Sequence, residues 1–343
     1  MKTRIEPGEK SMKKIVVAGI AVIAALVLVG SGAWTFPNFG TTETAEPITI
    51  GESSYELSSL IYIAENQGFF AENGLNVTFQ HDETGLASIN RLLNDEVDIA
   101  LTSEYVVVGT AFKKENISVI GSIDKFETVF LVGGKDRGII KVSDLKGKKI
   151  GLTRGTTQEF YLGRFLDLQA MNIEDVTLVN LQPTQYMHAF TNGSVDALVA
   201  GNMFIDPIQK QSGSDIALWH VQNSQKGYWL LTCRDGWASS HPEQIDKLLK
   251  AIVQAEEYTI NHPAEAKEIV QKRMNYTDAY MAVIWPQHQF SLTLDRSLLM
   301  AMSDEGRWMI NNNLTTEKTL PYFRDYIYTE GLEEVKPEAV NIR

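Results

Sequence analysis

The chain has 343 residues, of which 44% are hydrophobic and 22% charged, a composition that indicates a globular protein long enough for two lobes. The first 33 residues carry a charge of +3 and the whole chain −12, so the remaining chain carries −15. Such an acidic body argues against nucleic acid as a partner. The only cysteine, Cys233, excludes an intrachain disulfide.

The N-terminal segment has the three-part form of a secretory signal. Five basic residues precede the uncharged apolar run from Ile15 to Val29, and small residues up to Ala33 follow it. We expect residues 1–33 to be a signal peptide or, if they are not cleaved, a membrane anchor. The polar residues 34–46 indicate a linker. In either case we expect the body of the protein outside the cytoplasm, in the periplasm or at the cell surface.

Two stretches of the chain repeat one pattern of strands and helices. Each begins with a short strand ending in glycine, Gly51 and Gly151, and each closes with Val-Asp before an apolar run, at Asp98 and Asp196. Between these points a helical spacing of apolar residues, a strand and a second helix follow in the same order. The matched spacing predicts two equivalent βαβαβ units. We therefore expect an α/β fold with two mostly parallel sheets covered by helices.

Small polar residues, rich in hydroxyl groups, follow four of these strands. They come after Ile50, Leu101, Leu152 and Ala200. In open α/β sheets, ligands bind at the carboxyl ends of the strands. Two lobes that turn these ends toward each other would enclose a polar cleft.

The segment TRGTTQEF, residues 153–160, links one of these strand ends to a helix. Gly155 permits a tight turn, and Thr156 with Glu159 has the form of a capping box. A helix N-terminus offers free backbone N–H groups and a partial positive charge, so it can hold an anion. The alternative is that Thr156 only caps its own helix.

The second half of the chain is expected to return to the first lobe. The apolar segments 119–132 and 228–233 are predicted to cross between lobes. His241-Pro242 predicts the start of a helix, and His262-Pro263 predicts its end and the start of another. The expected lobes are residues 47–130 with 229–343, and residues 131–228.

Two motifs now resemble a known family. GFFAENGLNV at 68–77 and DLKGKKIG at 144–151, together with the Val-Asp strands and His241-Pro242-Glu243, resemble the extracytoplasmic solute-binding proteins of ABC importers. These importers take up nitrate, alkanesulfonates, taurine and thiamine-precursor pyrimidines. The resemblance implies the two-lobed venus-flytrap fold of type II periplasmic binding proteins, with two interlobe crossings. It also implies a monomer without cofactor that delivers a small-molecule ligand to an ABC permease and its ATPase.

The resemblance also places the ligand contacts, at the strand ends described above and at one further loop. The expected contact residues are Ser53, Ser54, Tyr55, Thr84, Gly85, Thr102, Ser103, Glu104, Gly155, Thr156, Thr157 and the segment from Asn202 to Asp206.

The charged candidates leave several ligands open. If Arg154 and Glu104 both face the cleft, the ligand is bipolar and a taurine-like aminosulfonate fits best. If only the turn at Thr156 contributes, an alkanesulfonate or nitrate fits equally well. Stacking on Tyr55 or Trp229 would favour a pyrimidine. For Arg154 the alternative is a solvated surface residue, and for Asp206 it is a helix cap.

Other chemistry has little support in the sequence. The six histidines show no metal-ligand spacing, and the motifs of hydrolases, P-loop proteins and dinucleotide-binding proteins do not occur. We expect no metal and no enzymatic activity. An enzyme on the same fold and an anchored ligand sensor remain the alternatives to a transport protein.

Overall fold

The computed structural model describes residues 45–53, 55–211, 215–223 and 225–342. Residues 45–343 form one compact unit, to which the rest of this description applies. The expected signal or anchor at 1–33 and most of the expected linker lie outside the described residues. Within the described residues, no helix is long and apolar enough to cross a membrane.

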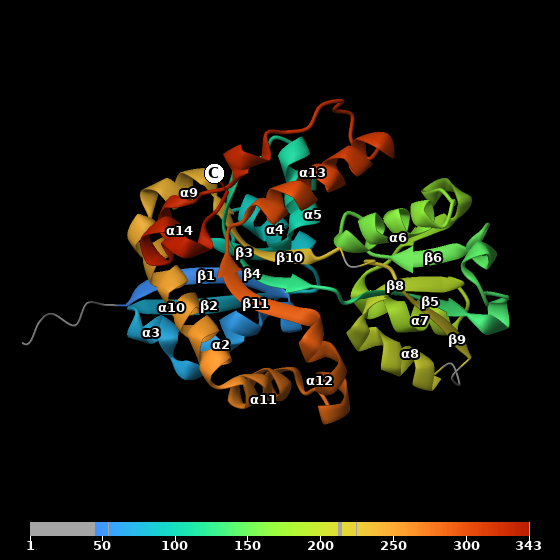
Figure 1. Cartoon of the computed structure of the whole chain (residues 1–343), viewed down its shortest axis with the longest axis horizontal. Coiled ribbons are helices and arrows are strands. Elements are labelled where there is room, and N and C mark those ends of the chain that lie inside the picture. Colours follow the sequence, from blue (N-terminus) through green and yellow to red (C-terminus); the bar gives the residue numbers. More distant parts are fainter. Residues whose placement is uncertain (1–44, 54, 212–214, 224, 343) are drawn as a thin grey trace, which may run out of the picture. The chain divides into compact units, whose positions relative to one another are not determined.

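The unit contains two β-sheets, each with helices on both faces (Figure 1). The first sheet has the strand order β11-β4-β10-β3-β1-β2 and the second has β7-β6-β8-β5-β9. The strands of the first sheet are β1 (Glu46–Ser53), β2 (Leu75–Asp82), β3 (Ile99–Ser103), β4 (Ile117–Phe126), β10 (Gly227–Arg234) and β11 (His288–Thr293). Those of the second are β5 (Val129–Gly134), β6 (Lys149–Leu152), β7 (Thr177–Asn180), β8 (Ala197–Gly201) and β9 (Ile216–His220).

Helices cover both sheets. Those of the first lobe are α2 (Ser59–Gln67), α3 (Phe69–Glu72), α4 (Gly85–Leu93), α5 (Glu104–Phe112), α9 (Asp235–Ser240), α10 (Pro242–Asn261), α11 (Pro263–Met274), α12 (Asp278–Ile284), α13 (Arg296–Asn311) and α14 (Glu330–Val335). Those of the second lobe are α6 (Thr157–Leu168), α7 (Tyr186–Thr191) and α8 (Ile205–Gln211). The predicted helix starts at Pro242 and Pro263 are confirmed.

The sheets are mixed, which corrects the expectation that they are mostly parallel. In the first sheet β1 pairs in parallel with β2 and β3, and in the second β6 pairs in parallel with β7 and β8. The other pairings are antiparallel. β10 enters the first sheet from the second lobe, and β5 enters the second sheet from the first lobe. Each sheet therefore contains a strand that has just crossed from the other.

The repeated sequence pattern corresponds to a repeated structure. The strand orders β2-β1-β3 and β7-β6-β8 are the same, so the predicted pair of equivalent units is confirmed. Asp98 and Asp196 occupy equivalent positions, each just before the third strand of its unit. The Asp98 carboxylate accepts the backbone N–H of Thr49 at 2.7 Å, and the Asp196 carboxylate accepts that of Lys149 at 2.8 Å. The two aspartates thus hold the first strand of each unit in register with the third.

Two short connections join the lobes. The first is Glu127–Thr128 between β4 and β5, and the second includes the described residues 221–223 and 225–226 between β9 and β10. The segment 228–233, expected to be the second crossing, instead lies inside β10, so the crossing directly precedes it. The lobe bounds stated from the sequence stay a prediction.

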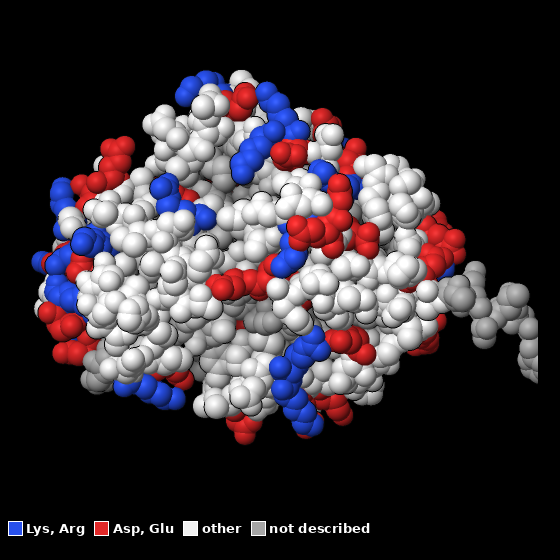
Figure 2. All heavy atoms as spheres, turned by 180° about the vertical axis from the view of Figure 1, so that it is seen from behind, with Lys and Arg blue, Asp and Glu red and all other residues white. Residues whose placement is uncertain are grey.

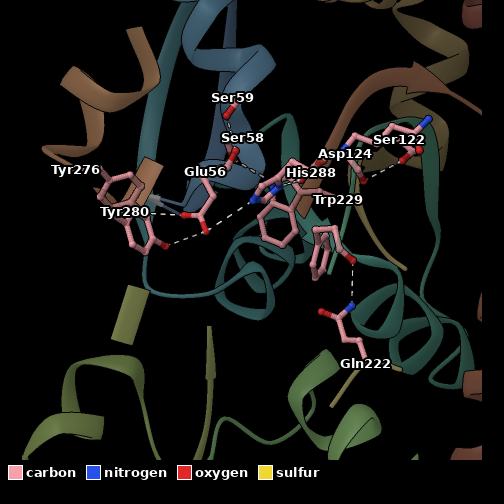
Figure 3. A network of polar contacts seen from close by, with 12 residues as sticks. Glu56, Ser58, Ser59, Ser122, Asp124, Gln222, Trp229, Tyr276, Tyr280 and His288 are labelled. Atoms are coloured by element: carbon pink, nitrogen blue, oxygen red, sulfur yellow. Dashed lines mark hydrogen bonds and ion pairs between the residues drawn. The ribbon is translucent and has the colours of Figure 1, made fainter. Parts of the chain in front are cut away.

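Buried Gln222 ties the two connections together. Its side-chain amide donates to the Phe126 carbonyl at 3.0 Å (Figure 3), and its side-chain oxygen accepts the Val129 N–H at 2.9 Å. The side chain is 2% exposed, so these bonds form away from water, where an unpaired amide would be costly. Gln222 therefore fixes the point at which the chain leaves one sheet and enters the other.

An aromatic contact joins the lobes beside the connections. Phe160 of α6 packs against Tyr105 of α5 and Trp308 of α13, with ring centroids 5.9 and 5.6 Å apart. The Trp308 indole lies against Gly163, where a Cβ atom would come within 2.1 Å of the ring. Glycine at this position lets α6 of the second lobe approach α13 of the first.

Removing either register-holding aspartate should destabilise the fold. We expect Asp98→Ala and Asp196→Ala each to lower the free energy of unfolding by about 1–2 kcal/mol, because a hydrogen bond from backbone to carboxylate is lost. Urea unfolding monitored by circular dichroism measures this. Asp167→Ala, at an exposed position on α6, is the control and should stay within about 0.5 kcal/mol of the parent. Equal stabilities for all three variants would contradict the assigned role.

Candidate ligand-binding cleft

A cavity of about 110 Å³ lies between the two lobes, at the carboxyl ends of β3 and β8. Both lobes contribute to its wall. The lining residues are Tyr55, Glu56, Leu57, Thr84, Gly85, Leu86, Ser103, Val106, Phe126, Thr128, Val129, Thr153, Thr156, Thr157, Gln158, Pro183, Gly201, Met203, Phe204 and Trp229. The position agrees with the strand ends from which the sequence predicted a cleft.

Three helices begin at the cavity, each preceded by a residue with a hydroxyl group. Thr84 precedes α4, Ser103 precedes α5 and Thr156 precedes α6. The N-terminal end of a helix carries free backbone N–H groups and the positive end of the helix dipole. Three such ends around one cavity favour an anionic group without a basic side chain.

The turn before α6 differs in detail from the expected capping box. Gly155 has a φ of 74°, so glycine is the favoured residue there. The Thr156 hydroxyl donates to the Thr153 carbonyl at 2.7 Å and does not cap the helix. Glu159 instead accepts the Gly155 N–H at 2.8 Å and binds the Arg154 guanidinium at 2.8 Å. Arg154 therefore forms a local ion pair and is not among the residues that line the cavity.

The other part of the wall is apolar and aromatic. Trp229 is held in place by its indole N–H, which donates to the Ser58 hydroxyl at 3.0 Å (Figure 3). A Cβ atom on Gly85 would lie 2.8 Å from the Thr102 backbone and 2.9 Å from the Trp229 ring. Gly85 is therefore required for the close contact between α4, β3 and this ring. Phe126 and Phe204 complete an apolar surface suited to the carbon skeleton of a ligand.

Glu56 is the one acidic residue among the described residues that line the cavity. The phenol groups of Tyr276 and Tyr280 donate to its two carboxylate oxygens, at 2.8 and 3.4 Å. Burial and the nearby Glu56 carboxylate raise the pKa of both phenols above the usual tyrosine value, so both stay protonated as donors. Figure 3 shows Glu56 between Tyr280 and His288.

A buried Asp124–His288 pair lies behind Glu56. His288 Nδ1 is 2.6 Å from an Asp124 carboxylate oxygen, and His288 Nε2 is 3.9 Å from Glu56 Oε1. Burial would lower the pKa of His288, but the Asp124 carboxylate outweighs it and the pKa is raised. Burial also raises the pKa of Asp124, against the opposing effect of His288. Asp124, His288 and Glu56 thus lie in one row, and Glu56 is its end at the cavity wall.

Glu104 faces away from the cavity and forms a buried pair with Glu305 of α13. Its carboxylate accepts the Tyr228 N–H at 3.0 Å. Burial raises the pKa of Glu104 to about 7, and burial together with the Glu104 charge holds the pKa of Glu305 well above the usual range. The two carboxyl groups can therefore share one proton near neutral pH. The structure gives Glu104 this role in the core and does not bring it to the cavity.

The structure brings some of the predicted contact residues to the cavity and leaves others outside. Those that line it are Tyr55, Thr84, Gly85, Ser103, Thr156, Thr157 and, from the predicted segment 202–206, Met203 and Phe204. Those that do not are Ser53, Thr102, Glu104, Arg154, Gly155, Asn202 and Asp206. Ser54 lies outside the described residues. Whether these eight lining residues bind a ligand stays a prediction.

Several lining residues were not predicted, for different reasons. Thr153 and Gln158 flank the predicted turn, and the strand-to-helix pattern could have included them. Glu56 follows Tyr55 directly, but its tyrosine partners are more than 200 positions away in the sequence. Thr128 lies at the first interlobe connection, inside the segment 119–132 that was predicted to cross between the lobes, but it was not predicted to line the cavity.

The charge distribution agrees with a small-molecule site. Among the described residues that line the cavity there is no Lys, Arg or His. On the face shown in Figure 2, Lys and Arg are interspersed with Asp and Glu and separated by neutral side chains. No group of three or more His, Cys, Asp and Glu residues in the described part of the chain could hold a metal ion.

The model of the family described as NMT1/THI5 like matches residues 58–266, more than half of the chain. The chain belongs to the NMT1/THI5-like family. The match begins at the start of α2 and ends in α11, so it includes both Val-Asp repeats and both interlobe connections. It confirms the family resemblance stated from the sequence.

The names of individual relatives of this NMT1/THI5-like chain indicate different functions. A Bacillus subtilis protein, named as a candidate aliphatic sulfonates-binding protein, is 25% identical over 256 residues, which is 73% of this chain and 76% of that protein. An Aspergillus parasiticus protein, named as 4-amino-5-hydroxymethyl-2-methylpyrimidine phosphate synthase, is 24% identical over 61% of this chain and 64% of that protein. The family therefore includes relatives named as binding proteins and as enzymes.

A solved structure shows the same fold. The alkanesulfonate-binding protein SsuA from Xanthomonas axonopodis pv. citri, bound to MOPS, matches with a TM-score of 0.72 and 14% identity. The match covers 82% of this chain and 98% of that chain. It confirms the two-lobed fold of type II periplasmic binding proteins.

The close contact at Gly85 yields a stability prediction. Gly85→Ala should lower the free energy of unfolding by about 1–3 kcal/mol, because the new methyl group would overlap the Thr102 backbone and the Trp229 ring. Gly201→Ala is the matched control, since Gly201 also lines the cavity but a Cβ atom added there would meet no other atom within 4 Å. Chemical denaturation of both variants measures the difference. A Gly85→Ala variant as stable as Gly201→Ala would refute the contact.

The Glu104–Glu305 pair should make stability depend on pH. The folded protein holds protons on this pair that the unfolded chain releases, so the pair's contribution to stability falls as pH rises from about 4.5 through 7. Glu305→Gln removes one acid and keeps a hydrogen-bond donor for Glu104. We expect it to raise the free energy of unfolding at pH 8 by about 1–3 kcal/mol and to have little effect at pH 4.5.

Urea unfolding across this pH range tests the expectation. Glu257→Gln on α10, an exposed position, is the control and should leave the pH profile unchanged. A Glu305→Gln profile parallel to that of the parent protein would show that the pair does not share a proton.

Proposed function

We propose that this protein is the extracytoplasmic substrate-binding component of an ABC importer. It captures a small organic anion or zwitterion between its lobes, with sulfonate-like and taurine-like compounds favoured and nitrate as a smaller alternative. Closure of the two lobes around the ligand presents the complex to a membrane permease and its ATPase. The protein acts as a monomer, exported by its N-terminal segment and anchored to the membrane if that segment is retained.

The observation that carries this proposal is the meeting of three helix N-terminal ends at one cavity, opposite an apolar wall. Thr84, Ser103 and Thr156 mark these three ends, and the first turn of a helix leaves backbone N–H groups without a partner inside the helix. An anionic head group can be held there without an ion pair. The apolar part of the wall, including Phe126 and Trp229, suits a short carbon chain. An alkanesulfonate has both parts: an anionic sulfonate group for the helix ends and a short alkyl chain for the apolar wall.

A thiamine-precursor pyrimidine is the second candidate ligand. Trp229, Phe126 and Tyr55 offer aromatic faces to the cavity, and Glu56 can accept hydrogen bonds from an aminopyrimidine. The relative named as a pyrimidine phosphate synthase gives this alternative some weight. For this chain we propose binding without turnover, since the cavity combines hydroxyl groups and one carboxylate in the manner of a recognition site.

The start of α6 provides a direct test. Thr156→Asp should weaken ethanesulfonate binding by about tenfold or more, because it adds a negative charge where the anion is held. Aspartate is a favoured residue at a helix N-cap, so the fold should be retained. Isothermal titration calorimetry, in a buffer free of sulfonates and sulfate, measures the affinity.

A matched control separates local repulsion from a change in net charge. Asn172→Asp adds the same charge at the N-cap of a short 3₁₀ helix (Ile173–Asp175) in the same lobe, outside the cavity. It should bind like the parent protein. Unchanged binding by Thr156→Asp would mean that α6 does not hold the anion, and no binding of any sulfonate by the parent would overturn the sulfonate proposal.

A further inference from the structure

Glu56 has hydrogen-bonding capacity that the protein does not use. A carboxylate offers about four acceptor positions, and the described contacts are one bond of 2.8 Å from Tyr276 and one longer bond of 3.4 Å from Tyr280. The residue is 5% exposed, so bulk water does little to satisfy the remaining positions. A buried carboxylate at a cavity wall is costly unless a donor or a cation meets it there.

The one imidazole beside Glu56 is shared with a second carboxylate, Asp124. His288 is the basic group in the row, and its Nδ1 faces Asp124 at 2.6 Å. Formal charges of Glu56, Asp124 and His288 therefore sum to a negative value, whether His288 is protonated or neutral. Since no Lys, Arg or His is found among the described residues of the wall, this negative charge faces the cavity without a balancing cation.

The polar group next to Glu56 in the row also has an unused hydrogen-bonding atom. His288 Nε2 is fully buried, has no hydrogen-bond partner among the described residues, and lies 3.9 Å from Glu56 Oε1. That separation is too long for a hydrogen bond. Glu56 is thus hydrogen-bonded by its two tyrosines and forms only a longer ion-pair contact with His288, and Figure 3 shows these side chains in one row.

We propose that Glu56 is a specificity-determining residue that binds a positively charged amino group, or an equivalent N–H donor, of the ligand. The inference rests on the proposed function in that it concerns the same cavity. Glu56 comes from the first lobe, whereas Thr156 and Thr157 at the start of α6 come from the second. A ligand with an amino group at one end and an anionic group at the other would bridge the lobes. An anion without an amino group would have neither a hydrogen-bond donor nor a positive charge to place against Glu56.

Aromatic side chains near Glu56 favour the same chemistry. Tyr55 and Trp229 line the cavity together with Glu56, and an aromatic face attracts a cation within about 6 Å of the ring. The sequence suggested Arg154 and Glu104 as the two poles of a bipolar site. The structure uses both of those residues elsewhere, and Glu56 with the α6 N-terminus provides the alternative pair of poles.

Matched pairs of compounds test the role of Glu56. Taurine and ethanesulfonate differ by one amino group, as do 3-aminopropanesulfonate and propanesulfonate. Calorimetry on the full protein in phosphate buffer, without amine or sulfonate buffers, gives the affinity ratio within each pair. We expect the aminated compound to bind about tenfold or more tightly in the parent protein, and Glu56→Gln to reduce this ratio to near 1.

Two further variants exclude indirect effects. Glu56→Gln keeps one oxygen to accept the Tyr276 O–H, and its NH2 group can donate to the Tyr280 hydroxyl, so its unfolding midpoint should stay close to that of the parent. Tyr276→Phe removes one hydrogen bond to Glu56 but keeps its charge, and should retain most of the preference for the amine. Glu72→Gln removes the same charge at an exposed position of the first lobe and should leave the ratio unchanged.

The outcomes separate this inference from the proposed function. Tight binding of ethanesulfonate, with no preference for taurine, would overturn the Glu56 assignment and support the sulfonate proposal. If sulfonates fail but propylammonium or a 4-aminopyrimidine binds and Glu56→Gln abolishes it, the assignment stands and the sulfonate proposal falls. Failure of all these compounds to bind would overturn both.

Discussion

Each sheet of this protein contains a strand that arrives directly from the other lobe, and the rest of the structure depends on this exchange. β4 leads into β5 through Glu127–Thr128, and β9 leads into β10 through the connection that includes residues 221–223 and 225–226. Because both connections are short and Gln222 bonds across them, the carboxyl ends of β3 and β8 are held facing a shared space. The cavity is a consequence of that constraint. Residues at the ends of those strands and just after them form part of its wall.

The chemistry of the cavity follows from the same geometry. Helices that start at strand ends direct their N–H groups into the space between the lobes, which suits an anion. Charged side chains are kept out of the cavity by local or buried pairs, as with Arg154 and Glu159 or Glu104 and Glu305. Glu56 is the exception, and its hydrogen bonds to two tyrosines place a single carboxylate in the wall. With one carboxylate in an otherwise uncharged wall, the site can distinguish small ligands that carry an amino group from those that do not.

Much of the fold could be predicted from local sequence patterns. The Val-Asp repeat is a short motif, and the structure explains it as the same hydrogen bond formed twice, by Asp98 and Asp196. The turn at Gly155 and the helix after it were also predictable, because a positive φ and a helical spacing of apolar residues leave clear local signals. These features depend on neighbours within about one structural unit.

The features that could not be predicted depend on distant partners. α5 contains three consecutive valines, which disfavour a helix, and it forms because it is buried on nearly all sides. Glu104 is at a strand end, as expected, but its partner Glu305 lies far along the chain, in α13, and draws it into the core. Glu56 is recruited to the cavity wall by Tyr276 and Tyr280. Residue type and local spacing therefore predicted where the cleft lies better than which charges it contains.

A crystal structure of the protein grown with 2-bromoethanesulfonate would test the central claim most directly. Anomalous scattering from bromine and sulfur would locate the two ends of the bound molecule independently. The account predicts the sulfonate at the start of α6, beside Thr156 and Thr157, and the bromine toward Phe126 and Trp229. A sulfonate bound outside the cavity, or an empty cavity at saturating ligand, would contradict it.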